Sequence, residues 1–228
     1  MLHWIASVQH CLHFRNTAIN RRFSLSLTRA VSKHTNSKET KKLAEQTQRL
    51  LAKNPGYPIT HVDFNKAIDS WAKAAPNVGK YAATQAENLL NHVETLHKSK
   101  KIRLETVTYN SCLNAYAKCN GGVESALKAQ NIFNRRTWKK NHISFHCLMD
   151  AWNKSKSFKA GHRSQSKLLF HKMQRWGLKP NVRTYSLLIT SLDANEASDV
   201  LRRMINNYLE NDGVCPDIII FNNVLKAW

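Results

Sequence analysis

Apolar and polar positions along the chain follow one pattern that occurs five times. Each copy has an aromatic residue, a polar residue directly after it, and apolar residues three, four and seven positions after the aromatic. In an α-helix these offsets lie on one face, so each copy predicts an amphipathic helix with a buried stripe. The aromatics are Phe64, Tyr109, Phe145, Tyr185 and Phe221, separated by 45, 36, 40 and 36 residues.

A second helical segment follows the first four copies. It starts with a small residue, which allows two helices to approach closely, and continues with apolar positions that seal the pair. The four segments are residues 86–93, 129–133, 166–173 and 197–204. Two helices of this length cannot bury both apolar stripes alone, so neighbouring hairpins must stack on one another. The pattern therefore predicts an all-α fold, an α-solenoid of helix-turn-helix repeats.

The repeat units follow from the spacing of the copies. They span residues 61–105, 106–141, 142–181 and 182–217, and residues 218–228 begin a fifth. First helices are expected to begin near residues 61, 106, 142, 182 and 218. The insertions at 153–162 and 205–213 are expected as bulging loops or extended helix ends. Because Trp228 falls in the middle of a helix that lacks its partner, the sequence is interpreted as a fragment of a longer protein.

A separate segment, residues 39–60, precedes the first repeat. Within it the stretch KKLAEQTQRLLAK (41–53) predicts an N-terminal capping helix that packs on the first repeat. Its apolar stripe is formed by Leu43, Leu50 and Leu51, and the following NPGYP breaks the helix off.

The first 38 residues differ in composition from the rest of the chain. They contain six Lys and Arg residues, many Ser and Thr residues, and not one Asp or Glu. This composition is typical of a disordered organellar transit peptide, and it favours the mitochondrion over the plastid. Removing these six charges from the formal net charge of +20 leaves +14, so the repeats are basic as well. Such a charge favours polyanionic partners, and no apolar run is long enough to span a membrane.

The residues that could carry catalysis are scattered. The five cysteines show no C-x-x-C pair, which disfavours a zinc site and fits buried reduced thiols. His142 and His146 have the spacing of helical metal ligands, but no third ligand accompanies them. The chain shows no nucleophile–base pattern and no Gly-rich phosphate loop. We therefore expect no enzyme activity, no metal site and no cofactor.

The paired helices resemble a known family of repeats. The stretch LFHKMQRWGLKPN (169–181) closes one unit, VRTYSLLI (182–189) opens the next, and together they resemble pentatricopeptide repeats. The resemblance implies a right-handed superhelix that binds single-stranded RNA, with one base read by each repeat. The insertions depart from the family's shorter repeat. Tetratricopeptide repeats are the nearest alternative, but their W-L-G-Y and A-F-P signature is absent.

The polar residue after each aromatic is the first candidate for RNA contact. It lies about 100° around the helix from the aromatic, on the side where first helices of successive repeats line up. Short polar side chains there suit the edge of a base, although helix capping is the alternative for any single copy. The column consists of Asn65, Asn110, His146, Ser186 and Asn222.

By the resemblance, each of these residues reads a base together with the last residue of its repeat. The pairs are Asn65 with Glu105, Asn110 with Asn141, His146 with Asn181, and Ser186 with Asp217. The Asn/Asn pair implies a pyrimidine and the Ser/Asp pair implies guanine, whereas the other two pairs depart from the common combinations.

The resemblance also implies contacts beside the base and along the RNA backbone. The residue two before the aromatic is expected to flank the base with an apolar side chain. Val62, Val107 and Ile143 fit this expectation. Arg183 does not, and it is expected to stack its guanidinium group on a base or to contact a phosphate. Lys73, Lys118 and Lys154 lie nine residues after their aromatics, where the family places a phosphate-contacting lysine, and the repeat of Tyr185 has Ala194 there. A solvated lysine is the alternative for each.

The expected function is sequence-selective binding of single-stranded RNA in an organelle, acting in RNA processing, stability or translation. Other organellar RNA-processing or ribosomal proteins are the second class of expected partner. The alternative is a helical-repeat adaptor, for example a scaffold associated with the mitochondrial ribosome, whose groove holds a protein.

Overall fold

The computed structural model describes residues 41–42, 44–45, 48–49, 60–155, 160–210 and 213–228, with the backbone alone for 160–164. The expected transit peptide, residues 1–38, lies outside this part of the chain. The described residues form helices and turns and contain no strand, which confirms the all-α prediction. They divide into two compact units, one ending at Ser191 and one beginning at Leu192.

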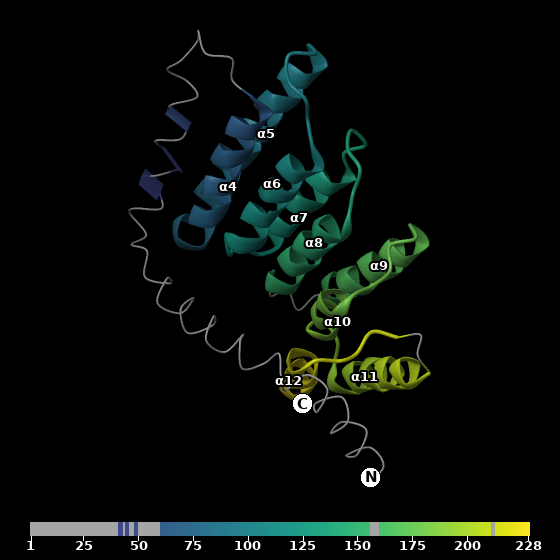
Figure 1. The fold of residues 1–228 in the computed structure, drawn as a ribbon. Helices are drawn as coiled ribbons and strands as arrows, with labels where there is room; N and C mark the ends of the chain where they lie inside the picture. Colours follow the sequence, from purple (N-terminus) through teal and green to yellow (C-terminus); the bar gives the residue numbers. More distant parts are fainter. Residues whose placement is uncertain (1–40, 43, 46–47, 50–59, 156–159, 211–212) are drawn as a thin grey trace, which may run out of the picture. The chain divides into compact units, whose positions relative to one another are not determined.

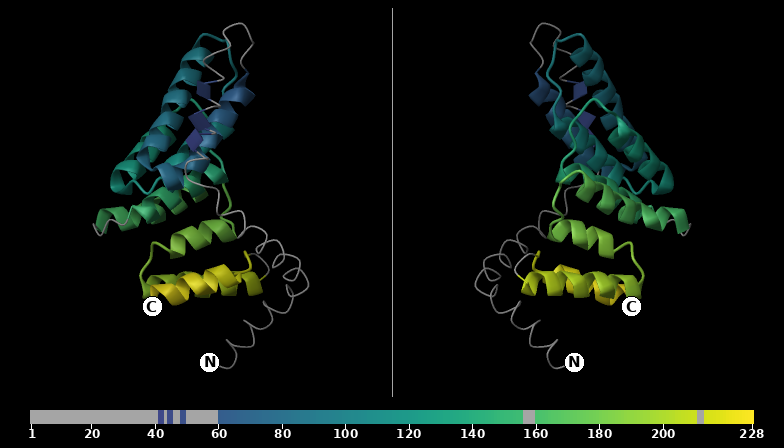
Figure 2. Two further views of the ribbon diagram at one scale, coloured as in Figure 1. Left: turned by 90° about the vertical axis from the view of Figure 1, so that its left-hand side faces the viewer. Right: turned by 90° about the vertical axis from the view of Figure 1, so that its right-hand side faces the viewer.

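The first unit consists of helical hairpins stacked side by side (Figures 1 and 2). Each hairpin packs on the next mainly through its first helix, since α4 contacts α6, and α6 contacts α8. The helices are α4 (His61–Val78), α5 (Lys80–Lys98), α6 (Thr106–Lys118), α7 (Gly122–Asn134), α8 (His142–Lys154), α9 (Ala160–Arg175) and α10 (Val182–Ile189).

First helices begin at the residues where the sequence places the repeats. Most of them are preceded by a residue whose side chain caps the helix. Asn141 and Asn181 each accept a hydrogen bond from a backbone N–H of the first turn and complete a capping box. Thr60 forms the equivalent box with Asp63 at the start of α4. Such caps satisfy backbone donors that otherwise lack a partner within the helix.

The core of the first unit lies between the first and second helices of each hairpin. Phe64, Tyr109 and Phe145 are buried, as the repeat pattern predicts. The small residues at which the second helical segments start, Ala86, Ala129 and Ser166, are buried as well, so the helices approach closely at these points.

Tyr185 differs from the other aromatics in its burial. It is half-buried and packs with its ring 5.5 Å from that of Phe170, and burial raises the pKa of its hydroxyl. Its helix α10 has only 8 residues, against 13 in α6 and in α8.

The second unit consists of α11 (Ala194–Leu209) and α12 (Ile218–Ala227), which pack against each other. Ala197, Leu201 and Met204 of α11 are buried, as are Ile220 and Val224 of α12. Residues 205–209 of the expected insertion prolong α11, so this part of the insertion is an extended helix end.

The described residues between 41 and 49, before the first repeat, are helical, and Gln48 among them bonds to α4 and α5. Ala44 is buried, and the amide oxygen of Gln48 accepts a 2.8 Å hydrogen bond from the indole N–H of Trp71 on α4. The side-chain amide of Gln48 also donates to Gln85 of α5, at 3.3 Å. The expected apolar stripe of Leu43, Leu50 and Leu51 lies outside the described residues.

We predict that Gln48→Ala lowers the free energy of unfolding by about 1–2 kcal/mol, because it leaves the N–H of Trp71 without its acceptor. The indole is only 1% exposed, so water cannot readily replace the lost bond. The measurement is urea unfolding, with Arg49→Ala, an exposed neighbour, as the control. Equal unfolding midpoints for the two variants would contradict the prediction.

No helix in the described part of the chain is long and apolar enough to cross a membrane. Four of the five cysteines lie there, and all four are free thiols. Burial raises the pKa of Cys147 to about 11 and also raises that of the fully buried Cys112. The thiols of Cys112 and Cys147 are therefore protonated at neutral pH, and Cys112 serves as a small core residue.

Candidate nucleic-acid interface

The polar column after the aromatics lies where successive first helices meet. Asn110 and His146 are only 7% and 6% exposed, whereas Asn65 and Ser186 are half-buried and Asn222 is exposed. The sequence predicts an outward-facing column, but in the first unit the helices stack closely enough to enclose much of it. Asn65, Asn110 and His146 each make a side-chain hydrogen bond.

Each of the first three column residues bonds to a hydroxyl of the next first helix. Asn65 accepts from the Thr108 hydroxyl at 2.6 Å, and Asn110 accepts from the Ser144 hydroxyl at 2.7 Å. The Nε2 atom of His146 lies 2.8 Å from the hydroxyl oxygen of Thr184. The column is therefore bridged from one repeat to the next.

The last residues of the repeats are the N-caps of the following first helices. The side chains of Asn141, Asn181 and Asp217 each accept from the backbone N–H three residues later, at 3.1, 3.0 and 3.0 Å. Glu105 makes no such bond, and its carboxylate lies 3.8 Å from nitrogen atoms of both His61 and Arg103. Capping therefore occurs in this second column rather than in the first.

Of the four predicted base-reading pairs, Asn110 and Asn141 are joined directly. The side-chain amide of Asn110 donates to the side-chain oxygen of Asn141 at 3.2 Å. Asn65 and His146 bond to the hydroxyls described above, and Asn181 to its own helix. Ser186 belongs to the first unit and Asp217 to the second.

The predicted base-flanking residues are exposed although they are apolar. Val62, Val107 and Ile143 are 44%, 56% and 55% exposed, and Arg183 is exposed in the same position of its repeat. Ile219, which the sequence analysis did not single out, occupies the equivalent position of the last repeat and is 55% exposed. Exposed apolar residues therefore recur at this position in four of the five repeats.

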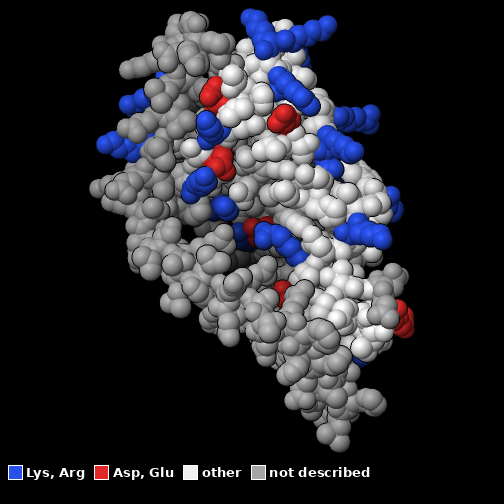
Figure 3. Space-filling model, viewed as in Figure 1, with Lys and Arg blue, Asp and Glu red and all other residues white. Residues whose placement is uncertain are grey.

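Two of the three predicted phosphate-contacting lysines are paired with a carboxylate on their own helix. Lys73 lies 2.7 Å from Asp69, and Lys154 lies 2.7 Å from Asp150. The equivalent position before Lys118 is Asn114, which carries no charge. The local net positive charge is therefore greater at Lys118 than at Lys73 and Lys154, whose charges are partly offset by the neighbouring carboxylates. Most charged side chains on the face shown in Figure 3 are basic.

His146 is the column residue whose chemistry differs most from an amide. Burial is the main cause that lowers its pKa to about 4, and the charges of Arg183 and His142 act in the same direction. The ring is therefore neutral at pH 7 and offers a hydrogen-bonding edge without a charge. Among the described residues there is no group of three or more potential metal ligands, and the other histidine of the i,i+4 pair, His142, bonds to the backbone oxygen of Lys179.

We predict that acidification destabilises the repeats through His146. Folding lowers the pKa of His146. Its contribution to the free energy of unfolding is therefore fully present above pH 6.5 and is lost as the pH falls from 6.5 toward 4. The unfolding free energy of the wild type should therefore fall by about 1–2 kcal/mol more than that of His146→Gln between pH 7 and pH 4.5. Urea unfolding at both pH values measures this, with the exposed His171→Gln as control. Parallel pH profiles for wild type and His146→Gln would refute it.

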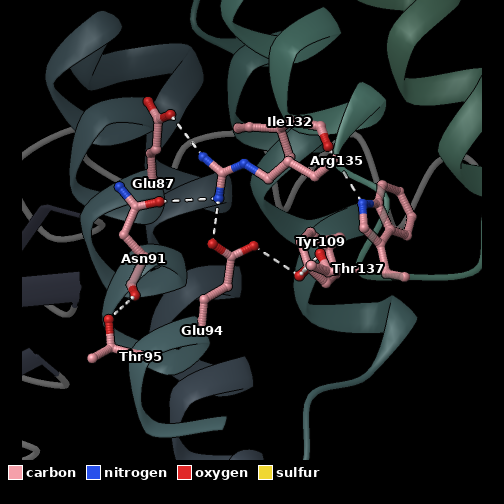
Figure 4. A network of polar contacts seen from close by, with 9 residues as sticks. Glu87, Asn91, Glu94, Thr95, Tyr109, Ile132, Arg135 and Thr137 are labelled. Atoms are coloured by element: carbon pink, nitrogen blue, oxygen red, sulfur yellow. Dashed lines mark hydrogen bonds and ion pairs between the residues drawn. The ribbon is translucent and has the colours of Figure 1, made fainter. Parts of the chain in front are cut away.

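A polar cluster that sequence reasoning missed joins α5, α6 and the end of α7 (Figure 4). The guanidinium of Arg135 lies 2.9 Å from Glu94, 3.0 Å from Asn91 and 3.4 Å from Glu87. The hydroxyl of Tyr109 donates to Glu94 at 2.8 Å, and that of Tyr116 donates to Glu87. This cluster, Arg135 with its partners Glu87, Asn91, Glu94, Tyr109 and Tyr116, ties the first repeat to the second.

The sequence carries one signal for this cluster. Glu87, Asn91 and Glu94 are spaced four and three residues apart, so they share one face of α5. An acidic face on a basic protein predicts a cationic partner. The partner itself, Arg135, comes from a turn more than 40 residues away, and only the packing of the hairpins brings it there.

Comparison with known proteins shows what the chain is similar to. A family model described as the pentatricopeptide repeat domain matches residues 168–228. Two crystal structures of the pentatricopeptide repeat protein PPR10 in complex with an 18-nt psaJ RNA element, one of them a triple cysteine-to-serine variant, have the same fold. Each superposes on 80% of this chain with 21% sequence identity and a TM-score of 0.53. Comparison with curated proteins finds no match.

The fold is therefore that of a helical-repeat solenoid, which confirms the predicted fold class. More specifically, residues 168–228 match the pentatricopeptide repeat model by sequence, which confirms the resemblance seen in the amino-acid pattern. The matched region is 24% of the PPR10 chain, so this chain spans about a quarter of the length of that protein.

Proposed function

We propose that the protein binds single-stranded RNA and selects its sequence through the polar columns of successive repeats. The observation that carries this proposal is the row of exposed apolar residues, Val62, Val107 and Ile143, each beside a hydrogen-bonded polar side chain. A base can insert between two such apolar side chains while its edge meets the polar group. The basic charge of the repeats supports the same ligand, as does the RNA bound to PPR10.

We further propose that the protein acts in an organelle, in RNA processing, stability or translation. The arginine-rich composition of residues 1–38, which lack any acidic residue, supports import and favours the mitochondrion over the plastid. Protein partners on this proposal are other RNA-processing or ribosomal proteins of the same compartment.

Crosslinking in isolated mitochondria tests the proposal. The tagged full chain should recover discrete RNA fragments after ultraviolet irradiation, and a variant with Val62, Val107 and Ile143 changed to Asp should recover far less. Those three residues are exposed, so the change adds negative charge to the surface without disturbing the core. Recovery of equal RNA by both proteins would contradict the proposed surface.

We predict that Asp217→Asn shifts the base preference of the repeat ending at this residue from guanine toward adenine, as the family's pattern implies. Asn caps a helix about as well as Asp does, so the start of α12 should be preserved. Binding to oligonucleotides that differ at one position measures the shift. If affinity for every oligonucleotide changes equally, Asp217 serves only as a cap.

A protein adaptor is the second candidate, and one observation favours it. A cavity of about 480 Å³ lies along α7, α8 and α9, and its lining includes Leu127, Leu168 and Trp152. Leu127 and Leu168 are 49% and 55% exposed, and Lys172 and Arg175 lie at the same cavity. Recovery of one protein and no RNA in the crosslinking experiment would favour the protein adaptor.

A further inference from the structure

Three buried hydroxyl groups occupy the same position in successive first helices. Thr108, Ser144 and Thr184 are each the third residue of their helix and are at most 1% exposed. Each bonds to the polar column residue of the repeat before it, at 2.6, 2.7 and 2.8 Å. The sequence analysis assigned no role to this third column.

Between the second and third repeats these bonds close a ring. The backbone N–H of Asn141 donates to the Ser144 hydroxyl oxygen at 3.1 Å, and the Ser144 hydroxyl donates to the side-chain oxygen of Asn110 at 2.7 Å. The amide of Asn110 donates in turn to the side-chain oxygen of Asn141 at 3.2 Å. The Ser144 hydroxyl oxygen also lies 3.1 Å from the side-chain oxygen of Asn141, and the shorter distance favours Asn110 as the acceptor of its one proton.

The ring also decides which way the Asn110 amide points. The Asn141 side-chain oxygen accepts the N–H of Ser144 as the helix cap, so the atom of Asn110 that faces this oxygen must be its nitrogen. The oxygen of Asn110 then faces Ser144, whose hydroxyl donates to it. If the hydroxyl were absent, this oxygen would have no donor at that place, and the amide would lose the contact that fixes its orientation.

An orientation fixed in this way determines what the pair offers to a base. One N–H of Asn110 and the amide group of Asn141 remain as donors, whereas the bonded oxygens each already accept a hydrogen bond. Donors on the protein select acceptors on the base, and both pyrimidines carry the O2 carbonyl as an acceptor. The hydrogen bonding is thus compatible with the pyrimidine that the family's pattern implies for Asn110 and Asn141, but the choice against purines, which also carry acceptors, comes from that pattern alone.

We propose that the third residue of each following first helix, Thr108, Ser144 or Thr184, is a positioning residue that sets base selectivity one repeat upstream. The inference rests on the proposed binding of single-stranded RNA. It makes the reading of one base depend on two neighbouring repeats, because the hydroxyl belongs to the repeat that reads the next base. The last first helix, α12, has Ile220 at this position, so it supplies no hydroxyl.

Selection from a random pool of single-stranded RNA with the full chain tests the proposal. Asn65→Ala and Asn110→Ala identify which positions of the selected motif belong to the first and second repeats. Thr108→Val removes a hydroxyl while keeping the shape of the side chain, and Glu105 makes no side-chain cap at the start of that helix. Thr106→Val is the matched control, because its hydroxyl bonds to the backbone oxygen of Lys139 instead.

Thr108→Val should reduce base discrimination at the position of the first repeat by on the order of tenfold and leave the other positions unchanged. Ser144→Ala should do the same at the position of the second repeat, and Ser144→Thr, which keeps a hydroxyl, should restore it. Each comparison is a ratio of bases within one protein, so a general loss of stability does not produce it.

The inference is overturned if Thr108→Val and Ser144→Ala weaken binding to all sequences equally, since the hydroxyls would then only stabilise the fold. It is also overturned if the affected position is that of the hydroxyl's own repeat. A wild-type protein that enriches no sequence at all would instead refute the proposed function, and the inference would fall with it.

Discussion

Replacing Arg135 with alanine is expected to lower the free energy of unfolding by about 3 kcal/mol. Glu87 and Glu94 have side chains only 17% and 20% exposed, so the lost guanidinium leaves two carboxylates near each other with little water to solvate them. The hydroxyls of Tyr109 and Tyr116 donate to the same two carboxylates, which spreads the effect into the core of the second repeat. Thermal and urea unfolding followed by circular dichroism measure it.

Arg136→Ala is the matched control, because this neighbouring arginine is exposed and its loss removes the same charge. Arg135→Lys should give an intermediate result, since one ammonium cannot reach both carboxylates with the geometry of a guanidinium. Adding Glu87→Gln and Glu94→Gln to the Arg135→Ala variant should recover part of the stability that Arg135→Ala loses. If Arg135→Ala and Arg136→Ala unfold alike, the cluster contributes nothing measurable.

Replacing Lys73, Lys118 and Lys154 together with alanine is expected to weaken RNA binding on the order of a hundredfold at about 50 mM salt. At roughly 0.7 per phosphate contact, the slope of log affinity against log salt should fall by about two units. Base preference should be unchanged, because phosphate contacts carry no sequence information. Fluorescence anisotropy over a salt series gives both quantities.

A variant with Lys98, Lys101 and Lys128 changed to alanine is the control for this triple change, since it removes the same charge from exposed positions outside the first helices. Single variants sharpen the test. Lys118→Ala should change the slope more than Lys73→Ala, because Asp69 already neutralises part of the Lys73 charge. Equal slopes for the two triple variants would show that only net charge matters.

The positions of the first helices could be predicted from the sequence because local chemistry sets them. A capping residue such as Asn181 and an amphipathic stripe beginning at Tyr185 lie within a few residues of each other, so no distant contact is needed to recognise them. The burial of Phe64, Tyr109 and Phe145 followed from the same periodicity.

The exposure of the polar column could not be predicted in this way. Whether Asn110 faces solvent depends on how closely α8 approaches α6, and that distance is set by side chains from two hairpins. The Arg135 cluster was missed for the same reason. Sequence periodicity describes one helix at a time, whereas these contacts arise between repeats.

The capping role of the last residue of each repeat limits how the protein can change its target during evolution. Asn141, Asn181 and Asp217 each begin a helix and are each predicted to read a base. Exchange among Asn, Asp, Ser and Thr keeps the cap, whereas replacement by an apolar residue costs about 1 kcal/mol. New specificities are therefore reached most readily by substitutions within this small group of residues, which alter the recognised base and leave the start of the helix intact.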